Sequence, residues 1–457
     1  MQNTTNQNKM AVIPVNKLLL SMGLPIIISM VLQALYNIVD SAFVANMKSN
    51  GEAALNALTL AFPMQMFIVA IGIGTGVGAN ALLARCLGQG DRLGANQTAG
   101  NSIFLGGVIY IVFLLFGIFG VKYYIESQSS NPLIVEMGIK YLRICCTLSF
   151  GIVFFSVFEK LLQASGHPLC STIAQISGAV ANIILDPIMI YGLFGCPEMG
   201  VAGAAYATVI GQWLSAALGL IFHLKFNTEI SKKLKYIKPS LKTIRGIYSI
   251  GLPAIIAQAL MSVMTYGLNI ILGSVSEAMV TAYGLYYKLQ QFVLFAAFGL
   301  RDAITPIVAF GFGMKNRGRV INGMKFGIMY SLIIMVIGTL AAEIFAVPFS
   351  QSFGLSGETM SLCVSAMHII SVCFVFAGVS IALQGIFQAL DGGVETLIIA
   401  LGRQFIFILP IAYLLAAAVR SCGAPESVIW VTFPFGELIT MLIACSMMKH
   451  KYKKISF

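Results

Sequence analysis

Charged residues are scarce in this 457-residue chain. Asp, Glu, Lys and Arg together make up 10% of it, whereas an ordinary soluble domain carries about 25%. Hydrophobic residues make up 58%, and the mean hydropathy is +0.88. A water-exposed globular surface over the whole chain is therefore excluded, and so is intrinsic disorder, which needs low hydrophobicity and high net charge. The composition is typical of a protein that crosses a membrane many times.

The chain also lacks the motifs of common catalytic, metal and nucleotide sites. Its four histidines are dispersed, and neither an HExxH motif nor a nucleophile elbow occurs. The nine cysteines include one adjacent pair, Cys145 and Cys146, but no CxxC, so they have neither zinc nor disulfide-framework spacing. The glycine-rich stretch 72–78 contains no phosphate-loop motif and indicates close helix packing. We therefore expect no enzymatic activity, no cofactor and no ATP-driven step.

Twelve apolar segments are long enough to cross a bilayer, which takes about 20 residues of helix. They cover residues 15–46, 53–84, 95–121, 133–163, 169–194, 201–224, 242–273, 278–310, 319–344, 360–389, 394–419 and 425–448. The polar N-terminus has no basic region followed by a short apolar core, so we expect the first segment to remain as a helix. The predicted fold is an all-α integral membrane protein with 12 transmembrane helices.

Lys and Arg are distributed unevenly between the two sides of the membrane. If the N-terminus is cytoplasmic, the external loops hold only Lys48, Lys122 and Arg420, while seven basic residues lie between Lys225 and Arg245 on the cytoplasmic side. The net charge of +11 is then a topology signal rather than a nucleic-acid site. We expect a multi-pass protein of the plasma (inner) membrane with both termini in the cytoplasm.

The two halves of the chain repeat each other. The sequence SMGLP at 21–25 returns as SIGLP at 249–253, and at a constant offset of 225 Arg92 matches Arg317 and Gln163 matches Gln388. Six helices per half is an even number, so the halves share one orientation, as in secondary transporters built from parallel repeats. We predict an N-terminal six-helix lobe over 1–228, a cytoplasmic linker over 229–240 and a C-terminal six-helix lobe over 241–457.

Two aspartates lie inside apolar segments of the first half, where a charged group costs about 2.5–3.5 kcal/mol even on the insertion scale. Asp40 and Asp186 fall at similar depth, and Pro187 weakens the helix directly after the second one. Polar residues precede them at helical spacing, namely Gln33, Tyr36 and Asn37 in the first segment and Gln175 and Asn182 in the fifth. A purely structural role, with both carboxyls hydrogen bonded inside the bundle, remains open. We favour a coupling-ion site, because carboxyl groups inside a membrane usually serve transport. The ion can be H+ or Na+, since both use carboxylates and hard oxygen ligands.

Other charged residues also fall within apolar segments. The second half carries Lys288, Arg301, Asp302, Arg403 and Glu437. Ion pairing inside the lobe and contact with substrate in a cavity are both open for these five. In the first half, we expect Glu159 and Lys160 to lie at the membrane interface.

Five short motifs occur in order along the first repeat: QALYNIVD at 33–40, LGQGD at 87–91, LQASG at 162–166, NIILDP at 182–187 and GVAGAA at 200–205. With these motifs the chain resembles the multidrug and toxic compound extrusion (MATE) family of bacterial efflux transporters, and the resemblance extends over nearly the whole chain, from GLP at 23–25 to the last helix. The resemblance implies two six-helix lobes around a central cavity. It also implies a secondary antiporter that exports drugs or other small organic, often cationic, compounds in exchange for H+ or Na+.

The resemblance also implies roles for single residues. The aspartates that belong to the coupling-ion site of bacterial members match Asp40 and Asp186, and Tyr141 and Thr208 join the residues around them. Acidic residues that some members carry on helices 7 and 10 have no counterpart in 242–273 or 360–389, so a second-lobe ion site of that kind is not expected.

Two other functions fit the sequence less well. A lipid-linked oligosaccharide flippase of similar layout is one, and an integral membrane transferase is the other, disfavoured because its catalytic residues would need long loops. We expect a monomer whose partners are the lipid bilayer and small-molecule substrates, without nucleic acid.

Overall fold

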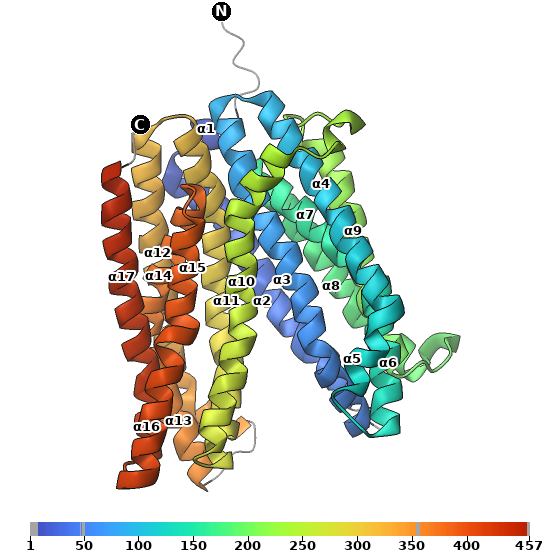
Figure 1. The fold of residues 1–457 in the computed structure, drawn as a ribbon, viewed down its shortest axis with the longest axis vertical. Coiled ribbons are helices and arrows are strands. Elements are labelled where there is room, and N and C mark those ends of the chain that lie inside the picture. The colour runs from blue at the N-terminus through green and yellow to red at the C-terminus, as the bar shows by residue number, and fades with distance from the viewer. Residues whose placement is uncertain (1–7, 46, 48–50, 353–356, 455–457) are drawn as a thin grey trace, which may run out of the picture. The chain divides into compact units, whose positions relative to one another are not determined.

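Helices make up all the regular structure of the part of the chain that the computed structural model describes, residues 8–45, 47, 51–352 and 357–454 (Figure 1). Ten of them are long and apolar enough to cross a membrane. Two further pairs, Pro132–Thr147 with Phe150–Ala164 and Gly357–Ser371 with Phe374–Ala389, pass the same test together and bend by 43° and 50° at a short break. With each bent pair counted as one span the total is twelve, so the predicted all-α membrane fold is confirmed.

The described residues of the first half form nine α-helices. They are α1 (Lys9–Val12), α2 (Val15–Ala45), α3 (Gly51–Gln89), α4 (Arg92–Leu115), α5 (Val121–Glu126), α6 (Pro132–Thr147), α7 (Phe150–Ala164), α8 (Pro168–Tyr191) and α9 (Val201–Phe226). A π-turn over Phe116–Gly120 joins α4 to α5 within one span. The turn before α4 follows from its sequence: Gly90 adopts a φ of +72°, and the Asp91 side chain accepts a hydrogen bond from Gly94 N at 2.9 Å, which caps the helix.

The linker and the second half follow the same pattern. The linker contains one 3-10 turn, η3 (Leu234–Ile237). After it come α10 (Leu241–Gly273), α11 (Glu277–Gly313), α12 (Arg317–Ser352), α13 (Gly357–Ser371), α14 (Phe374–Ala389), α15 (Gly393–Leu401), α16 (Ile408–Cys422) and α17 (Thr432–Lys454). A π-turn, η4 (Gly402–Ile406), separates α15 from α16, and a 3-10 turn, η5 (Glu426–Val431), precedes α17.

The helices form two compact units. The first contains Met1–Val12 and Ile28–Ile255, and the second contains Ile13–Ile27 and Ile256–Phe457. Two of the three divisions fall inside α2 and α10, so each of these helices contributes to both units. The lobes predicted at 1–228 and 241–457 were defined by the sequence repeat, and they stay a prediction. The two units are defined instead by which residues pack against each other.

Glycines let neighbouring helices approach α3 closely. A Cβ atom added to Gly78 would lie 2.0 Å from the backbone oxygen of Ile247 in α10, and one added to Gly76 would lie 2.7 Å from Cγ of Lys160 in α7. Real Cβ atoms essentially never come so close, so only glycine fits at these positions. The prediction that the glycine-rich stretch packs helices together is confirmed.

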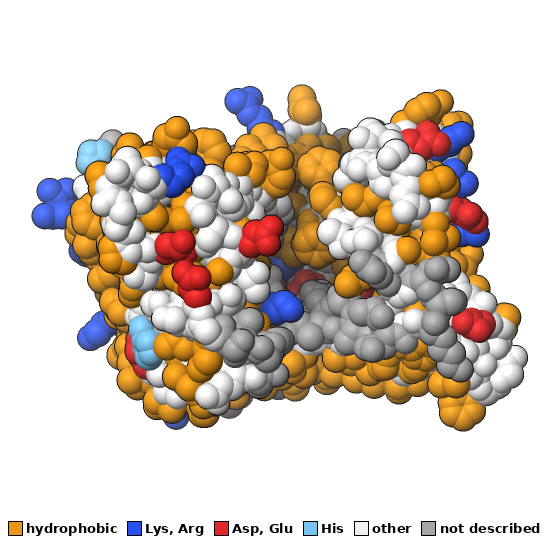
Figure 2. All heavy atoms as spheres, turned by 90° about the horizontal axis from the view of Figure 1, so that it is seen from below, with side chains coloured by type: hydrophobic (Ala, Val, Ile, Leu, Met, Phe, Trp, Pro, Cys, Tyr) orange, Lys and Arg blue, Asp and Glu red, His pale blue; other side chains and the backbone are white. Residues whose placement is uncertain are grey.

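Each unit buries its own apolar core and leaves large hydrophobic side chains on its surface. Phe119 is 68% exposed, Ile337 61% and Leu414 67%. Hydrophobic side chains form much of the outline in the space-filling view (Figure 2). Such a surface suits lipid tails, because they solvate apolar groups without the cost that water imposes.

Candidate functional site

Helices α2 and α8 bring the two predicted aspartates of the first unit together. The carboxyl groups of Asp40 and Asp186 interact with each other, and Asp186 is fully buried. A hydrogen bond from the Tyr191 hydroxyl to the backbone oxygen of Phe43, 2.7 Å long, ties the end of α8 to α2 beside them. The structure therefore places both carboxyls in one site, as the sequence predicted.

Asn182 connects this pair to α9. Its Nδ2 donates to Asp186 Oδ1 at 3.2 Å and to Thr208 Oγ1 at 3.4 Å. The contact is close because α8 and α9 cross at two glycines, and a Cβ atom on Gly178 would lie 2.4 Å from the backbone oxygen of Gly211. The predicted neighbours Asn182 and Thr208 thus lie beside Asp186, and their role at an ion site stays a prediction.

Three oxygen atoms around the pair are buried and have no hydrogen-bond partner among the described residues. They are Asp40 Oδ1, Asp186 Oδ2 and Asn182 Oδ1. A buried polar atom without a partner costs free energy, and a buried carboxylate oxygen costs more than a neutral one. A bound proton or a small cation would satisfy these atoms, because all three are acceptors.

Of the other predicted residues, Tyr141 lies near this centre. Tyr141 is buried in α6, and its hydroxyl accepts a hydrogen bond from Gln65 Nε2 at 3.2 Å. Cys145, one turn further along α6, is within electrostatic reach of Asp40. Gln65 of α3 was missed by the sequence analysis, since nothing in its spacing links it to the polar stripes of α2 and α8. Tyr36 and Asn37 belong to α2, but their side chains lie outside the described part of the structure.

A small cavity lies against the site. Its volume is about 60 Å³ and it is bounded by α2, α7, α8 and α9. Gln175 Nε2 donates to Gln33 Oε1 at its edge, and Asn182 and Thr208 belong both to its lining and to the carboxyl site. A cavity needs only about 10–15 Å³ to hold one water molecule. The cavity therefore has room for several waters, which could carry a proton or hydrate a cation beside the carboxyls.

The predicted charges of the second unit form two ion pairs. Arg403 Nε donates to both carboxylate oxygens of Glu437, at 3.0 and 2.9 Å, and both side chains are buried. Arg403 lies in the π-turn η4, and Gly402 beside it lets α17 come close, since an added Cβ would lie 3.0 Å from Thr440 Oγ1. Ion pairing inside the lobe, one of the two alternatives left by the sequence, is what the structure shows for this pair.

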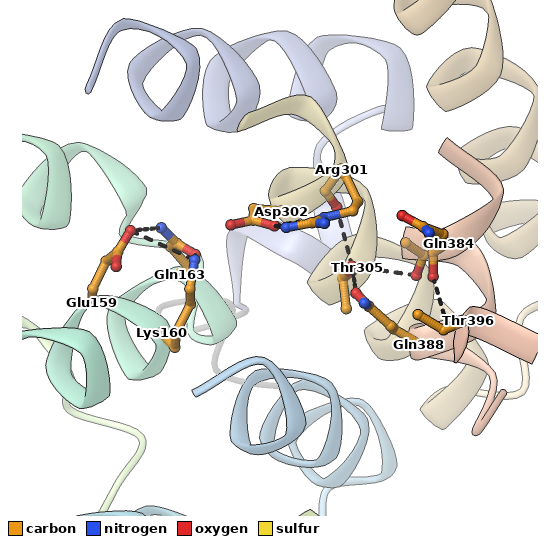
Figure 3. A network of polar contacts seen from close by, with 10 residues as sticks. Glu159, Lys160, Gln163, Arg301, Asp302, Thr305, Gln384, Gln388 and Thr396 are labelled. Carbon is orange, nitrogen blue, oxygen red and sulfur yellow. Dashed lines mark hydrogen bonds and ion pairs between the residues drawn. The ribbon is translucent and has the colours of Figure 1, made fainter. Parts of the chain in front are cut away.

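The second pair is local to α11. Arg301 Nε and Nη2 both donate to Asp302 Oδ1, at 3.0 and 2.9 Å, and Figure 3 shows the two side chains next to each other. Thr305, one turn later, connects to Gln388 of α14 at 3.4 Å. Lys288 lies in the same helix with an exposed side chain. Substrate contact by any of these residues remains a prediction.

Glu159 and Lys160 are deeply buried inside the protein near the end of α7, whereas their position at the membrane interface stays a prediction. They are 6% and 1% exposed. Lys160 Nζ lies 3.6 Å from Glu159 Oε1, and Gln163 bridges them by accepting from Lys160 at 3.1 Å and donating to Glu159 at 2.9 Å (Figure 3). The ammonium group is tolerated there because a carboxylate and an amide surround it and Gly76 leaves room for its stem.

The two repeats carry a basic residue and a glycine at swapped positions where two helices cross. At the offset of 225, Gly76 matches Arg301 and Lys160 matches Gly385. In the first unit Lys160 of α7 packs over Gly76, and in the second unit Arg301 of α11 packs over Gly385, where an added Cβ would lie 2.9 Å from Arg301 Cγ. Each crossing thus has one large and one small partner; the cation is buried in the first crossing and partly exposed in the second.

Comparison with known proteins places these features in a family. The sequence profile of the MatE family matches residues 25–188 and 253–414. The multidrug export protein MepA of Staphylococcus aureus (strain MRSA252) is 26% identical over 426 residues, which cover 91% of this chain and 90% of that protein. The MepA of Staphylococcus haemolyticus (strain JCSC1435) is 24% identical over 414 residues, with 91% and 89% covered.

Solved structures show the same fold. An outward-facing multidrug resistance MATE family transporter of the MOP superfamily matches with a TM-score of 0.91 at 23% identity over 99% of both chains. A MOP superfamily transporter from Pyrococcus furiosus matches with a TM-score of 0.90 at 24% identity over 100% of both chains. Since the family profile covers well over half of the chain and the twelve spans agree, this multi-pass membrane protein belongs to the MatE family of efflux transporters, of the bacterial type.

Proposed function

We propose that this protein is a secondary antiporter that exports drugs or other small organic, often cationic, compounds in exchange for H+ or Na+. The observation that carries the proposal is the interacting pair Asp40 and Asp186, of which Asp186 is buried and Asp40 half-buried, with acceptor oxygens that have no donor among the described residues. The substrate class is supported by the relatives that are named multidrug export proteins.

The proposed mechanism begins with neutralisation of the carboxyl pair. Two carboxylates in one dry site repel each other and are poorly solvated, so a proton or Na+ binds there favourably. Asn182 and Thr208 orient Asp186 toward that ion. Each 100 mV of membrane potential contributes about 2.3 kcal/mol per charge carried fully across, so one inward cation can drive useful export.

Helix α8 is suited to respond to the charge change. Pro187, directly after Asp186, leaves the backbone oxygen of Ile183 without its helical partner and weakens the helix at that point. In the proposal, neutralising the pair removes the repulsion between α2 and α8, and the weakened turn allows α8 to repack. That repacking changes access to the substrate cavity.

We place the protein in the plasma (inner) membrane with both termini in the cytoplasm, acting as a monomer without a cofactor. The unequal distribution of Lys and Arg between the loops supports this orientation. The lipid bilayer and small-molecule substrates are its proposed partners.

Transport in proteoliposomes tests the proposal. The purified chain is reconstituted, and uptake or release of a fluorescent cationic dye is followed under a pH gradient alone and under a Na+ gradient alone. We expect one gradient to drive transport, and we expect Asp40→Asn and Asp186→Asn to abolish that drive while inserting normally, because Asn keeps the shape but cannot titrate.

Glu136→Gln is the matched control. Glu136 is an exposed carboxylate of the same unit, paired with Lys140 at 2.7 Å on the surface of α6. It should leave gradient-driven transport unchanged. Wild-type coupling in both Asn variants, with normal amounts of folded protein, would place the coupling ion elsewhere and end the proposal.

A further inference from the structure

A second cavity of the first unit lies apart from the carboxyl pair. Its volume is about 480 Å³, and it is bounded by α4, α7, α9 and the linker segment 230–237. Phe150, Phe154 and Phe158 of α7 and Trp213 and Leu220 of α9 form its apolar walls. The size falls within the range of about 300–1,000 Å³ that is usual for small-molecule sites. None of its lining residues lines the small cavity beside the aspartates.

The linker packs against α4 at one end of this cavity. Asn96 Oδ1 accepts a hydrogen bond from Ser231 N at 2.6 Å, and Asn101 Oδ1 accepts one from Ser240 N at 2.7 Å. Gly100 allows the backbone of α4 to contact the backbone of the linker, because a Cβ atom added to Gly100 would lie only 2.1 Å from the backbone oxygen of Tyr236. These contacts hold the linker in a defined position, so the cavity rim is part of the fold.

The rim combines positive charge with an outward-facing leucine. Lys232, Lys233 and Lys235 are exposed, and Leu234 between them is 79% exposed. Such a segment matches a membrane interface, where an apolar side chain enters the acyl region and lysines reach the headgroups. The described lining contains basic residues but no Asp or Glu. An apolar cavity with a basic rim complements an amphiphile that has an apolar tail and a negative head.

We propose that this cavity binds one anionic phospholipid. An acyl chain lies along Phe154 and Trp213, and the phosphate group is held at the rim by Lys232 and Lys233. Basic pockets between transmembrane helices are known to hold anionic lipid headgroups. The site is distinct from the proposed ion site, and it ties the linker to the bilayer.

Trp213 makes the proposal measurable in the intact protein. The chain contains two tryptophans; Trp213 lines the cavity and is 46% exposed, whereas Trp430 is completely buried in the second unit. Bromine atoms on a lipid acyl chain quench the fluorescence of a tryptophan that they touch. In mixed vesicles, brominated phosphatidylglycerol as a minor component should quench Trp213 severalfold more than the same fraction of brominated phosphatidylcholine.

Variants separate the headgroup contact from the tail contact. Lys232→Gln with Lys233→Gln should abolish the preference for phosphatidylglycerol, whereas Lys449→Gln with Lys453→Gln, which removes equal charge from the exposed end of α17, should retain it. Ala217→Phe should occupy part of the cavity beside Trp213 and reduce quenching by both lipids. Trp213→Phe should leave only an unquenched background from Trp430.

Equal quenching by the two lipids, or an unchanged preference in the Lys232 and Lys233 double variant, would show ordinary boundary lipid and overturn the proposal. Mass spectrometry of the lipids that stay bound through purification gives a second measurement that depends on no cavity variant. Phosphatidylglycerol should be enriched over its share of the membrane in the wild type and not in the double lysine variant. Absence of enrichment in the wild type would also refute the site.

Discussion

The buried pair Arg403 and Glu437 allows a quantitative test of whether the charges of the second unit stabilise the fold or contact substrate. Arg403 Nε contacts both carboxylate oxygens of Glu437 at 2.9–3.0 Å, and the side chains are 7% and 8% exposed. Removing one partner of such a pair leaves an uncompensated charge in a place that water does not reach. The cost is typically about 3–5 kcal/mol.

We therefore expect Glu437→Gln and Arg403→Met each to lower the free energy of unfolding by about 3–5 kcal/mol. The double variant Arg403→Met with Glu437→Leu should lose much less than the sum, because no buried charge remains without a partner. Denaturant titration of the purified protein in detergent micelles measures all three. Dye transport in proteoliposomes and dye binding to the purified protein are then measured for the double variant.

Each outcome separates the two alternatives. A stable double variant that still transports shows that the pair serves the fold, and a stable double variant that binds no dye shows that it contacts substrate. A Glu437→Gln protein that unfolds like the wild type, or single-variant losses that simply add, would refute the energetic reasoning.

Three further predictions concern packing, capping and topology. Gly78→Ala should destabilise the protein by about 1–3 kcal/mol, because the new Cβ atom would lie 2.0 Å from a backbone oxygen. Gly107→Ala is the control and should not destabilise it, because its Cβ atom would meet nothing within 4 Å. The melting temperatures of the two variants test this difference. Asp91→Ala should cost about 1 kcal/mol through loss of the α4 cap, and Asp91→Asn, which keeps the acceptor, should restore most of it in the same assay. A membrane-impermeant thiol reagent should label a cysteine engineered at Gln128 from outside but not one at Lys233, and the reverse pattern would contradict the proposed orientation.

The spans could be read from the sequence because their signal is local. About 20 apolar residues in a row suffice to cross a bilayer, whatever the neighbouring helices do. The bends at 148–149 and 372–373 were not predicted, since both lie inside continuous apolar segments. The family assignment was confirmed because its motifs, such as NIILDP at 182–187, are also contiguous.

The candidate ion site was only half predictable. Asp40 and Asp186 stand out because charge is rare and costly inside apolar segments, and helical spacing pointed to Asn182. Gln65 gave no such signal, since a neutral polar residue among apolar ones has many structural uses. Its contact with Tyr141 depends on how α3 and α6 pack.

By itself, the sequence determined how many times the chain crosses the membrane and which carboxyl groups stand out within it, because segment length, hydropathy and helical period are properties of neighbouring residues. Only the tertiary structure decided which faces meet. It buried Lys160 against Gly76, paired Arg403 with Glu437, and held the linker beside an aromatic cavity. Helical period assigns residues to a face of one helix, but the partner of that face is chosen by packing between segments far apart in the chain.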